Sequence, residues 1–365
     1  MSLNQGSDQG LASSAAVFSA AELRQFTARV LESCGATPGH AALVAESLVT
    51  SNLLGHDSHG IIRLPSYCAR IQRGELDPVA EPTLLRENGG TAVIDGGNTF
   101  GQVVGRYGCE VAVRLAKAHG ISAVVLHRTT HVGRLGEYAE VIAGSGCIAL
   151  LFASGADRGG AVAPYGGRQR RLGSNPVAWA VPVPAGHPPL IGDFATAAIA
   201  VGKVAVAKAS GGQVPDNTVI AADGSPSTDP NAYFAGGALL PFGGHKGGSL
   251  MILIEILAAI LGGNAPASSR EFKPGNPTLL IALRVDHLMA EGIFLRQVAE
   301  LGDNIASCPP AAGFDRVRLP HALELETAAR RSRDGIALPD SLVGDLQRLA
   351  TSLSVAPPQA KLLGS

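Results

Sequence analysis

"TAVIDGGNTFGQVVGRYGCEVAVRLAKAHGISAVVLHR" spans Thr91–Arg128, and the spacing of its apolar residues changes twice along its length. Residues 91–96 and 121–128 are short β-branched runs, whereas residues 101–120 repeat apolar side chains at helical intervals and end on Gly120. This order predicts a strand, a helix and a second strand. The alternation continues with strands at 147–154, 175–183, 189–195 and 276–285 and with helices at 133–146 and from residue 246. We therefore expect a sheet domain over residues 91–294.

Both ends of the chain have helical patterns instead. Ser19 and Glu22 have capping-box spacing, and Thr37 before Pro38 is typical of a second helix start. A short third helix is expected from Pro65 to Gly74, and the chain becomes helical again after residue 290. The predicted architecture is α/β, with a central mixed sheet and a helical domain formed by residues 19–90 plus 295–355. Residues 1–18 and 356–365 are expected to be flexible tails.

Composition limits the classes of function. Of 365 residues, 46% are hydrophobic, 16% are charged and 4% are aromatic, and the net charge is −1. A neutral chain with few aromatic residues lacks the features of nucleic-acid binding. Five dispersed cysteines without a CxxC pair favour a reducing compartment, so we expect a soluble, cytoplasmic protein. The apolar segment 247–263 is interrupted by Glu255 and is short for a membrane span, so it is expected to be a buried helix.

Several catalytic and nucleotide-binding signatures are absent from the sequence. It contains no GxGxxG, GxxxxGK[ST], HExxH or GxSxG motif. His56 and His59 are three residues apart, but no third metal ligand accompanies them at a recognisable spacing. We therefore expect no metal site, and a bound nucleotide would need a cradle of another kind.

The densest polar stretch is "DSHGIIRLPSY", residues 57–67. If it is helical from His59, then His59, Arg63 and Tyr67 project to one side. A histidine exchanges protons near neutral pH, and an arginine fork matches a carboxylate, so this set suits a small carboxylic acid substituted at C2. The alternative is a polar junction between helices in which His59 caps backbone carbonyls.

Other polar residues adjoin the predicted strands. His131 follows one strand and precedes a helix, a common ligand position in α/β sheets. Asp193 lies in an apolar strand and requires a hydrogen-bond partner, for which His59 is a candidate. His245 and Lys246 precede the apolar helix and form a candidate anion site. Ser174, Asn175 and Thr196 are the remaining polar residues on or beside these strands.

Five motifs occur in a fixed order: "DSHGIIRLPSY", "THVGRLGEY", "APYGGRQRRLGSNP", "GDFATAA" followed by "VGKV", and "LPFGGHKGGSL". Together they resemble the malate/L-lactate dehydrogenase family of NAD(P)-dependent oxidoreductases. That family also includes sulfolactate and ureidoglycolate dehydrogenases, diketogulonate reductase and piperideine-2-carboxylate reductase. The resemblance implies a non-Rossmann dinucleotide-binding domain, a homodimer and an active site between domains. It also implies hydride transfer between NAD or NADP and C2 of a small 2-hydroxy or 2-oxo acid, or alternatively reduction of a cyclic 2-imino acid.

The resemblance also implies roles for individual residues. His59 matches the acid/base histidine, Ser58 lies beside it, Asp193 is its expected partner, and in some relatives the histidine at the position of His131 is the proton acceptor. Positions that match substrate contacts are Arg63, Tyr67, Ser174, Val201 and Gly202. Positions that match cofactor contacts are His131, Val132, Gly133, Arg134, Leu135, Ser154, Asp193, Phe194, Ala195, His245 and Lys246.

The chain departs from the family pattern in two places. Val201 stands where relatives often have arginine or a large aromatic residue, so the exact substrate is left open. The segment "LPHALELE", residues 319–326, replaces a "PGE" segment that contacts cofactor in relatives. The choice of nucleotide is also open, because the basic cluster Arg168, Arg170 and Arg171 suits either a 2′-phosphate or a solvated surface.

Overall fold

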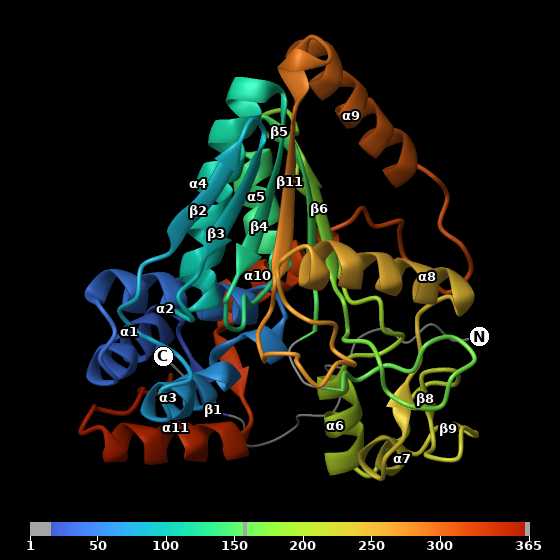
Figure 1. The fold of residues 1–365 in the computed structure, drawn as a ribbon. Coiled ribbons are helices and arrows are strands. Elements are labelled where there is room, and N and C mark those ends of the chain that lie inside the picture. Colours follow the sequence, from blue (N-terminus) through green and yellow to red (C-terminus); the bar gives the residue numbers. More distant parts are fainter. Residues whose placement is uncertain (1–15, 156–158, 362–365) are drawn as a thin grey trace. The chain divides into compact units, whose positions relative to one another are not determined.

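The computed structural model describes residues 16–155 and 159–361 (Figure 1). It divides the chain into two compact units. The first takes residues 1–79 and 323–365, and the second takes residues 80–322.

The first unit is mainly helical. Its helices are α1 (Ala20–Ser33), α2 (Pro38–Leu53), α3 (Leu64–Gln72), α10 (Ala322–Asp334, whose first residue belongs to the second unit) and α11 (Asp340–Ser352). The predicted caps are present, since the Ser19 side chain accepts a hydrogen bond from the Glu22 N–H at 3.1 Å. The Thr37 hydroxyl likewise accepts from the His40 N–H at 3.2 Å. Both helix starts inferred from capping residues are confirmed.

A two-stranded sheet joins the N-terminal and C-terminal segments of this unit. Strand β1 (Ala16–Phe18) pairs antiparallel with β12 (Ile336–Leu338). The Lys361 N–H donates to the Val17 carbonyl at 2.6 Å, so the described end of the chain lies against the same strand. Strand β1 falls within the predicted tail 1–18; residues 1–15 of that tail and residues 362–365 of the C-terminal one lie outside the described residues.

The second unit contains a seven-stranded sheet with the order β2-β3-β4-β11-β5-β6-β7. Only β3 and β4 run parallel, and every other neighbouring pair is antiparallel, so the predicted mixed sheet is confirmed. The strands are β2 (Thr83–Asn88), β3 (Thr91–Asp95), β4 (Ile121–His127), β5 (Cys147–Ala153), β6 (Val177–Val181), β7 (Leu190–Phe194) and β11 (Thr278–Arg284).

Helices pack on both faces of this sheet (Figure 1). On one face, α4 (Gly101–His119) and α5 (Leu135–Ala143) share a core with strand residues such as Leu151. The next residue along β5, Phe152, points the opposite way and packs near Ile254 of α8 (His245–Ile254). Helix α8 continues as a π-helix, η3 (Glu255–Ile260).

The expectation that this apolar helix is buried is only half correct. One side of it packs on the sheet, and five large aliphatic side chains on the other side are exposed: Ile252, Leu253, Ile256, Ile260 and Leu261. The physical reason is geometric, because a helix laid on a sheet buries only the stripe that faces the sheet. We call these five residues the apolar strip.

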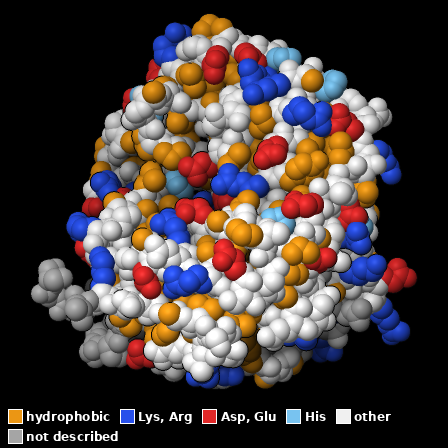
Figure 2. Space-filling view, turned by 90° about the vertical axis from the view of Figure 1, so that its left-hand side faces the viewer, with side chains coloured by type: hydrophobic (Ala, Val, Ile, Leu, Met, Phe, Trp, Pro, Cys, Tyr) orange, Lys and Arg blue, Asp and Glu red, His pale blue; other side chains and the backbone are white. Residues whose placement is uncertain are grey.

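The remaining elements of the second unit carry weaker sequence signals. They are α6 (Val201–Ala209), α7 (Pro230–Phe234), α9 (Glu291–Ala306) and the two-residue strands β8 (Val219–Ile220), β9 (Pro226–Ser227) and β10 (Ala238–Leu239). The three short strands form a separate sheet of order β10-β8-β9. No helix among the described residues is long and apolar enough to cross a membrane. On the face shown in Figure 2, basic and acidic side chains are interspersed and leave no broad area of one sign.

Candidate active site

The polar stretch after α2 is not one helix. Asp57–His59 and Ile61–Arg63 each form a separate 3₁₀ turn, η1 and η2, and Gly60 between them is extended with ψ −155°. The condition for His59, Arg63 and Tyr67 to align, one helix running from His59, is therefore not met. The α-helix α3 begins at Leu64, directly after the second turn.

Asn52 fixes the break between the two turns. Its Oδ1 accepts from the Ile61 N–H at 2.8 Å, and its Nδ2 donates to Asp57 Oδ1 at 2.6 Å. A Cβ on Gly60 would lie 2.2 Å from Asn52 Oδ1, so the close approach requires glycine. Asp57 is also held by Arg331 of α10, whose Nη1 and Nη2 donate to its two carboxylate oxygens at 2.7 and 3.0 Å.

The residues of this unit that are predicted to act in catalysis or substrate binding differ in their hydrogen bonds and in their burial. Ser58 Oγ lies 3.0 Å from His59 Nδ1, and Arg63 Nε donates to the Ser58 carbonyl at 2.7 Å. The two terminal nitrogens of Arg63 make no hydrogen bond or ion pair with any described residue, which leaves one edge of the guanidinium for a ligand. Tyr67 is buried, with 2% of its surface exposed.

His56, also in this stretch, has a structural setting. Its Nε2 lies 3.5 Å from a carboxylate oxygen of Glu324. Glu324 belongs to the segment 319–326 that departs from the family pattern. Among the described residues, no group of three His, Cys, Asp or Glu side chains could hold a metal ion.

In the second unit, the predicted residues gather at one edge of the sheet. Asp193 at the end of β7 accepts from the Gly136 N–H at 2.7 Å, where α5 begins. This bond ties Asp193 to the segment 131–135, which was predicted to contact cofactor. Asp193 and His59 belong to different units, so their pairing stays a prediction.

Thr196 joins two more of the predicted segments. Its hydroxyl lies 3.0 Å from the Ser174 carbonyl and 2.8 Å from the Asn175 carbonyl. Its own carbonyl accepts from the Phe242 N–H at 2.9 Å, in the loop that precedes α8. The motifs around Ser174, Asp193 and His245 are thus hydrogen-bonded to one another.

The groups at this edge fit an anionic dinucleotide. Arg134 is 3% exposed, and two of its guanidinium nitrogens, Nε and Nη1, have no hydrogen-bond partner among the described residues. Its Nη2 lies 4.0 Å from a carboxylate oxygen of Glu140, so Nε and Nη1 are the buried donors suited to an anion. Helix α8 begins with exposed His245 and Lys246, and its N-cap residue, Gly244, has no side chain to cap the first N–H groups. Such a helix start is suited to a phosphate.

Four other predicted site residues differ in exposure. Ser154 is fully buried, and its hydroxyl donates to Glu255 at 3.0 Å rather than pointing outward. Phe194 is 45% exposed and meets Phe242 edge to face. Val201 and Gly202 are exposed in the first turn of α6.

The residue that sequence reasoning missed is Glu255. In the sequence it only interrupts an apolar segment, whereas in the structure it lies buried behind Ser154 and Asn175. The available signal was its position as the only charged residue in the apolar segment 247–263. A buried carboxylate is costly unless it is hydrogen-bonded, so such a residue predicts a polar network.

Two of the three arginines of the basic cluster, Arg170 and Arg171, form hydrogen bonds within the fold. Arg170 donates to the carbonyls of Gly237 and Tyr233 and stacks on the Tyr233 ring at 4.0 Å. Arg171 bonds to the Arg170 carbonyl and to Gln169. Of the three arginines, only Arg168 has no hydrogen bond with a described residue.

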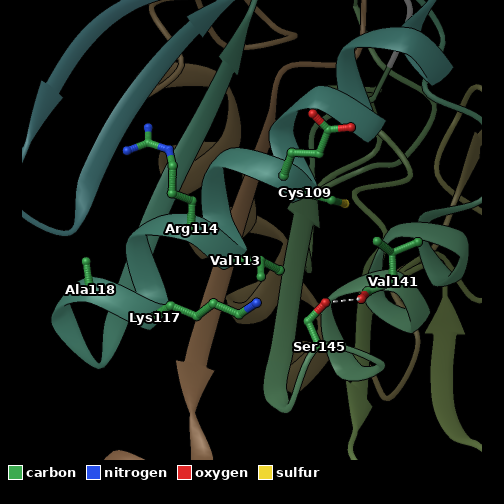
Figure 3. A pocket seen from close by; sticks show the side chains of 8 residues that line it. Cys109, Val113, Arg114, Lys117, Ala118, Val141 and Ser145 are labelled. Carbon is green, nitrogen blue, oxygen red and sulfur yellow. Dashed lines mark hydrogen bonds between the residues drawn. The ribbon is translucent and has the colours of Figure 1, made fainter.

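A groove of about 630 Å³ lies away from these residues, on the outer side of α4 and α5 (Figure 3). It is lined by Arg114, Lys117, Val141 and Ser145 among others, none of which was predicted as a site residue. Burial raises the pKa of the Cys109 thiol beside it, so this cysteine stays protonated and unreactive. The groove supplies no catalytic group to the site.

Comparison with known proteins gives the family. The model of the malate/L-lactate dehydrogenase family matches residues 18–347. L-lactate dehydrogenase of Cupriavidus necator is 38% identical over 87% of this chain and 92% of its own. A Δ1-pyrroline-2-carboxylate/Δ1-piperideine-2-carboxylate reductase of Pseudomonas putida is 35% identical over 66% of this chain and 70% of its own.

A solved structure agrees with these sequence matches. The structure of sulfolactate dehydrogenase from Methanocaldococcus jannaschii superposes with a TM-score of 0.84 at 31% identity. The match covers 93% of this chain and 98% of that one. The chain therefore belongs to the malate/L-lactate dehydrogenase family of oxidoreductases.

Proposed function

We propose that this enzyme transfers hydride between a nicotinamide dinucleotide and C2 of a small 2-hydroxy or 2-oxo acid. The observation that carries the proposal is the set of hydrogen bonds that joins the motifs of Asp193, Ser174 and His245 at one sheet edge. Membership of a dehydrogenase family supports the reaction type. When bound, the nicotinamide supplies or accepts the hydride.

The protein's own residues bind the substrate and move the proton. His59 protonates the substrate oxygen during reduction, and Ser58, 3.0 Å from its Nδ1, orients the ring. Arg63 holds the carboxylate through its two terminal nitrogens, because its Nε is already bonded to the Ser58 carbonyl. Asp193 stabilises the histidinium. Fixing substrate and dinucleotide in reacting geometry accounts for much of the expected rate gain.

Reduction of a cyclic 2-imino acid is the second candidate. The relative from Pseudomonas putida is named for that activity. Val201, a medium-sized apolar residue, stands 36% exposed at the first turn of α6, where relatives often have a larger or charged residue. A smaller side chain leaves room for a ring substrate, which favours this candidate.

The dinucleotide is NADH or NADPH. Arg134 and Lys246 are the cations proposed to meet its phosphates. Arg168 is the one member of the basic cluster proposed for a 2′-phosphate, since Arg170 and Arg171 bond within the fold. Fluorescence titrations with both reduced nucleotides, on wild-type protein and Arg168→Ala, measure the preference and its cause.

The proposal includes a homodimer in which a second copy of the chain covers the apolar strip. Five exposed aliphatic side chains on one helix face form the kind of patch that stable subunit interfaces bury. Sedimentation equilibrium is expected to give twice the chain mass for wild type and a monomer for Ile256→Glu. Leu85→Glu, at an exposed position of β2, serves as the control and should stay dimeric. A monomeric wild type would contradict the homodimer.

The reaction is tested by steady-state assays with pyruvate, oxaloacetate and piperideine-2-carboxylate, each with NADH and with NADPH. Turnover of an open-chain acid supports the first candidate, and turnover of the cyclic imine alone supports the second. Nucleotide binding without turnover of any of the three substrates would indicate a binding protein that has lost catalysis. Absence of nucleotide binding would overturn the proposal.

A further inference from the structure

Glu255 is a buried carboxylate at the point where helix α8 passes into the π-helix η3. It is 5% exposed, and its three hydrogen-bond partners among the described residues are all donors. Oε2 accepts from Ser154 Oγ at 3.0 Å and from Asn175 Nδ2 at 2.9 Å, and Oε1 accepts from the Ala267 N–H at 2.6 Å. No lysine, arginine or histidine pairs with it among the described residues. This polar network therefore depends on one carboxylate.

The network gives the Asn175 amide a single orientation. Nδ2 donates to Glu255 and to the Met251 carbonyl at 3.0 Å, and Oδ1 accepts from the Gly155 N–H at 3.1 Å. A carbonyl or carboxylate oxygen can only accept and an N–H can only donate, so rotating the amide by half a turn would lose all three bonds. Asn175 also has a positive φ of 40°, an uncommon conformation that its surroundings must hold.

Asn175 and Ser154 in turn hold the backbone of the proposed site. The Asn175 and Ser174 carbonyls are bonded to Thr196, two residues after Phe194. The Ser154 carbonyl accepts from Asn276 Nδ2 at 3.0 Å, and Asn276 Oδ1 accepts from the Val132 N–H at 3.3 Å. Glu255 is thus one hydrogen bond from the Ser174–Asn175 segment and three residue-to-residue hydrogen-bond links from the His131–Leu135 segment.

The helix that carries Glu255 also carries the proposed phosphate contacts. Helix α8 begins at His245 and Lys246, and Glu255 follows it directly. The Leu261 N–H bonds to the Ile256 carbonyl five residues back, which is the wider π register. Single π turns of this kind occur often at functional sites.

We propose that Glu255 is a positioning residue that sets the placement of α8 against the sheet edge. Through it, the phosphate contacts at the helix start and the Ser174 and Val132 segments are held in one arrangement. This inference rests on the proposed dinucleotide and 2-oxo-acid chemistry. In the proposed arrangement, Glu255 itself contacts neither substrate nor nucleotide.

Glu255→Gln tests the proposal with little change in shape. The new NH₂ group must face either the Ala267 N–H or the Asn175 NH₂ group, and both are donors. Because the Met251 carbonyl and the Gly155 N–H fix the Asn175 amide, Asn175 cannot turn to accept. Either orientation therefore breaks at least one bond of the network, and the site geometry relaxes.

We expect Glu255→Gln to lower kcat by about 10- to 100-fold, the size expected when a remote change misplaces reacting groups by about 1 Å. The assay is run well below the unfolding midpoint. Hydrogen exchange should accelerate locally at the Ala267 amide if the new NH₂ group faces it, or at the Gly155 amide if that group displaces Asn175. Glu271→Gln is the matched control, because Glu271 is exposed and loses the same charge. It should leave kcat and exchange unchanged.

A purely structural role makes a different prediction. It would lower the midpoint of thermal unfolding and leave kcat per folded molecule unchanged, and that result would overturn the proposal. If Glu255→Gln does not fold, Ser154→Ala removes one donor and keeps the carboxylate, and it should accelerate exchange at the same two amides. Unchanged exchange there would equally overturn it. A wild type without nucleotide binding or turnover would instead refute the proposed function, and the exchange data would still judge the network.

Discussion

Asp193 caps helix α5: its Oδ2 accepts a hydrogen bond from the Gly136 N–H at 2.7 Å. A Cβ on Gly136 would lie 3.1 Å from that oxygen and 2.5 Å from Arg134 Nη1, so glycine allows three groups to converge. The end of β7 is thereby joined to the start of α5. The carboxylate has a structural role in addition to the proposed catalytic one.

Two substitutions of Asp193 separate these roles. Asp193→Asn keeps an oxygen that can accept from Gly136, so we expect an unfolding free energy within about 0.5 kcal/mol of wild type. It removes the charge proposed to stabilise the His59 cation, so kcat should fall by about 100-fold or more. Asp193→Ala should lose the activity and also about 1 kcal/mol of stability. Urea unfolding and steady-state kinetics measure the two effects, and a fully active Asp193→Asn would disprove the catalytic role.

His59→Ala should lower kcat by about 10²- to 10⁴-fold, the usual contribution of a general acid–base group. His56→Ala is the matched control, because His56 lies three residues earlier and pairs with Glu324 instead. Its kcat should stay close to that of wild type. Near-normal turnover of His59→Ala would mean that another group, such as His131, moves the proton.

Arg63→Ala should mainly weaken substrate binding. Loss of a charged hydrogen-bonding partner costs about 1.5–3 kcal/mol, which corresponds to a rise in KM of about 10- to 100-fold. Arg63→Lys keeps the charge without the planar fork, so its KM should lie between that of wild type and that of Arg63→Ala. The comparison is made with a single 2-oxo acid at saturating dinucleotide. Unchanged KM and kcat in Arg63→Ala would exclude the carboxylate contact.

Gly60→Ala should distort the segment that carries His59. The added methyl group would meet Asn52 Oδ1 at 2.2 Å, and Asn52 is buried and bonded to both Ile61 and Asp57. We expect a loss of about 1–3 kcal/mol in unfolding free energy, together with lower kcat. Gly39→Ala in α2 is the control, since a Cβ there meets nothing within 4 Å. That control should be neutral or slightly stabilising, and equal effects from the two substitutions would contradict the explanation.

Much of the fold could be predicted because periodicity and capping are local signals. The helix starts at Ser19 and Thr37 and the core strands β3, β4, β5 and β11 follow from residues close together in the sequence. Strand β2 could not be predicted in this way, because all six of its residues are exposed and show no alternation. Its formation depends on pairing with β3, which is a tertiary contact.

The candidate site was partly predictable for the same reason. The motifs around His59, Asp193 and His245 are readable as polar residues in apolar surroundings. The break between the two 3₁₀ turns at Gly60 could not be predicted from local sequence, because it depends on the side chain of Asn52, eight residues earlier. The partners of Glu255 come from positions up to 101 residues away in sequence, so only the fold reveals that network.

The ion pair between Asp95 and Arg128 makes the stability of the sheet depend on pH. Arg128 Nε donates to Asp95 Oδ1 at 2.8 Å, and the guanidinium holds the pKa of that carboxyl below its usual range, with help from the Gly97 N–H. Because the pKa is lowered in the folded state, the stabilisation is present above the unfolded-state pKa of about 3.9. The stabilisation is lost as the pH falls through the folded-state pKa.

Asp95→Asn should therefore lower the unfolding free energy by about 1 kcal/mol at pH 7 and by progressively less below about pH 4. Urea unfolding at both pH values measures this, with exposed Asp216→Asn as the control. A difference between Asp95→Asn and wild type that stays constant down to pH 3 would show that the pair's charge contributes nothing.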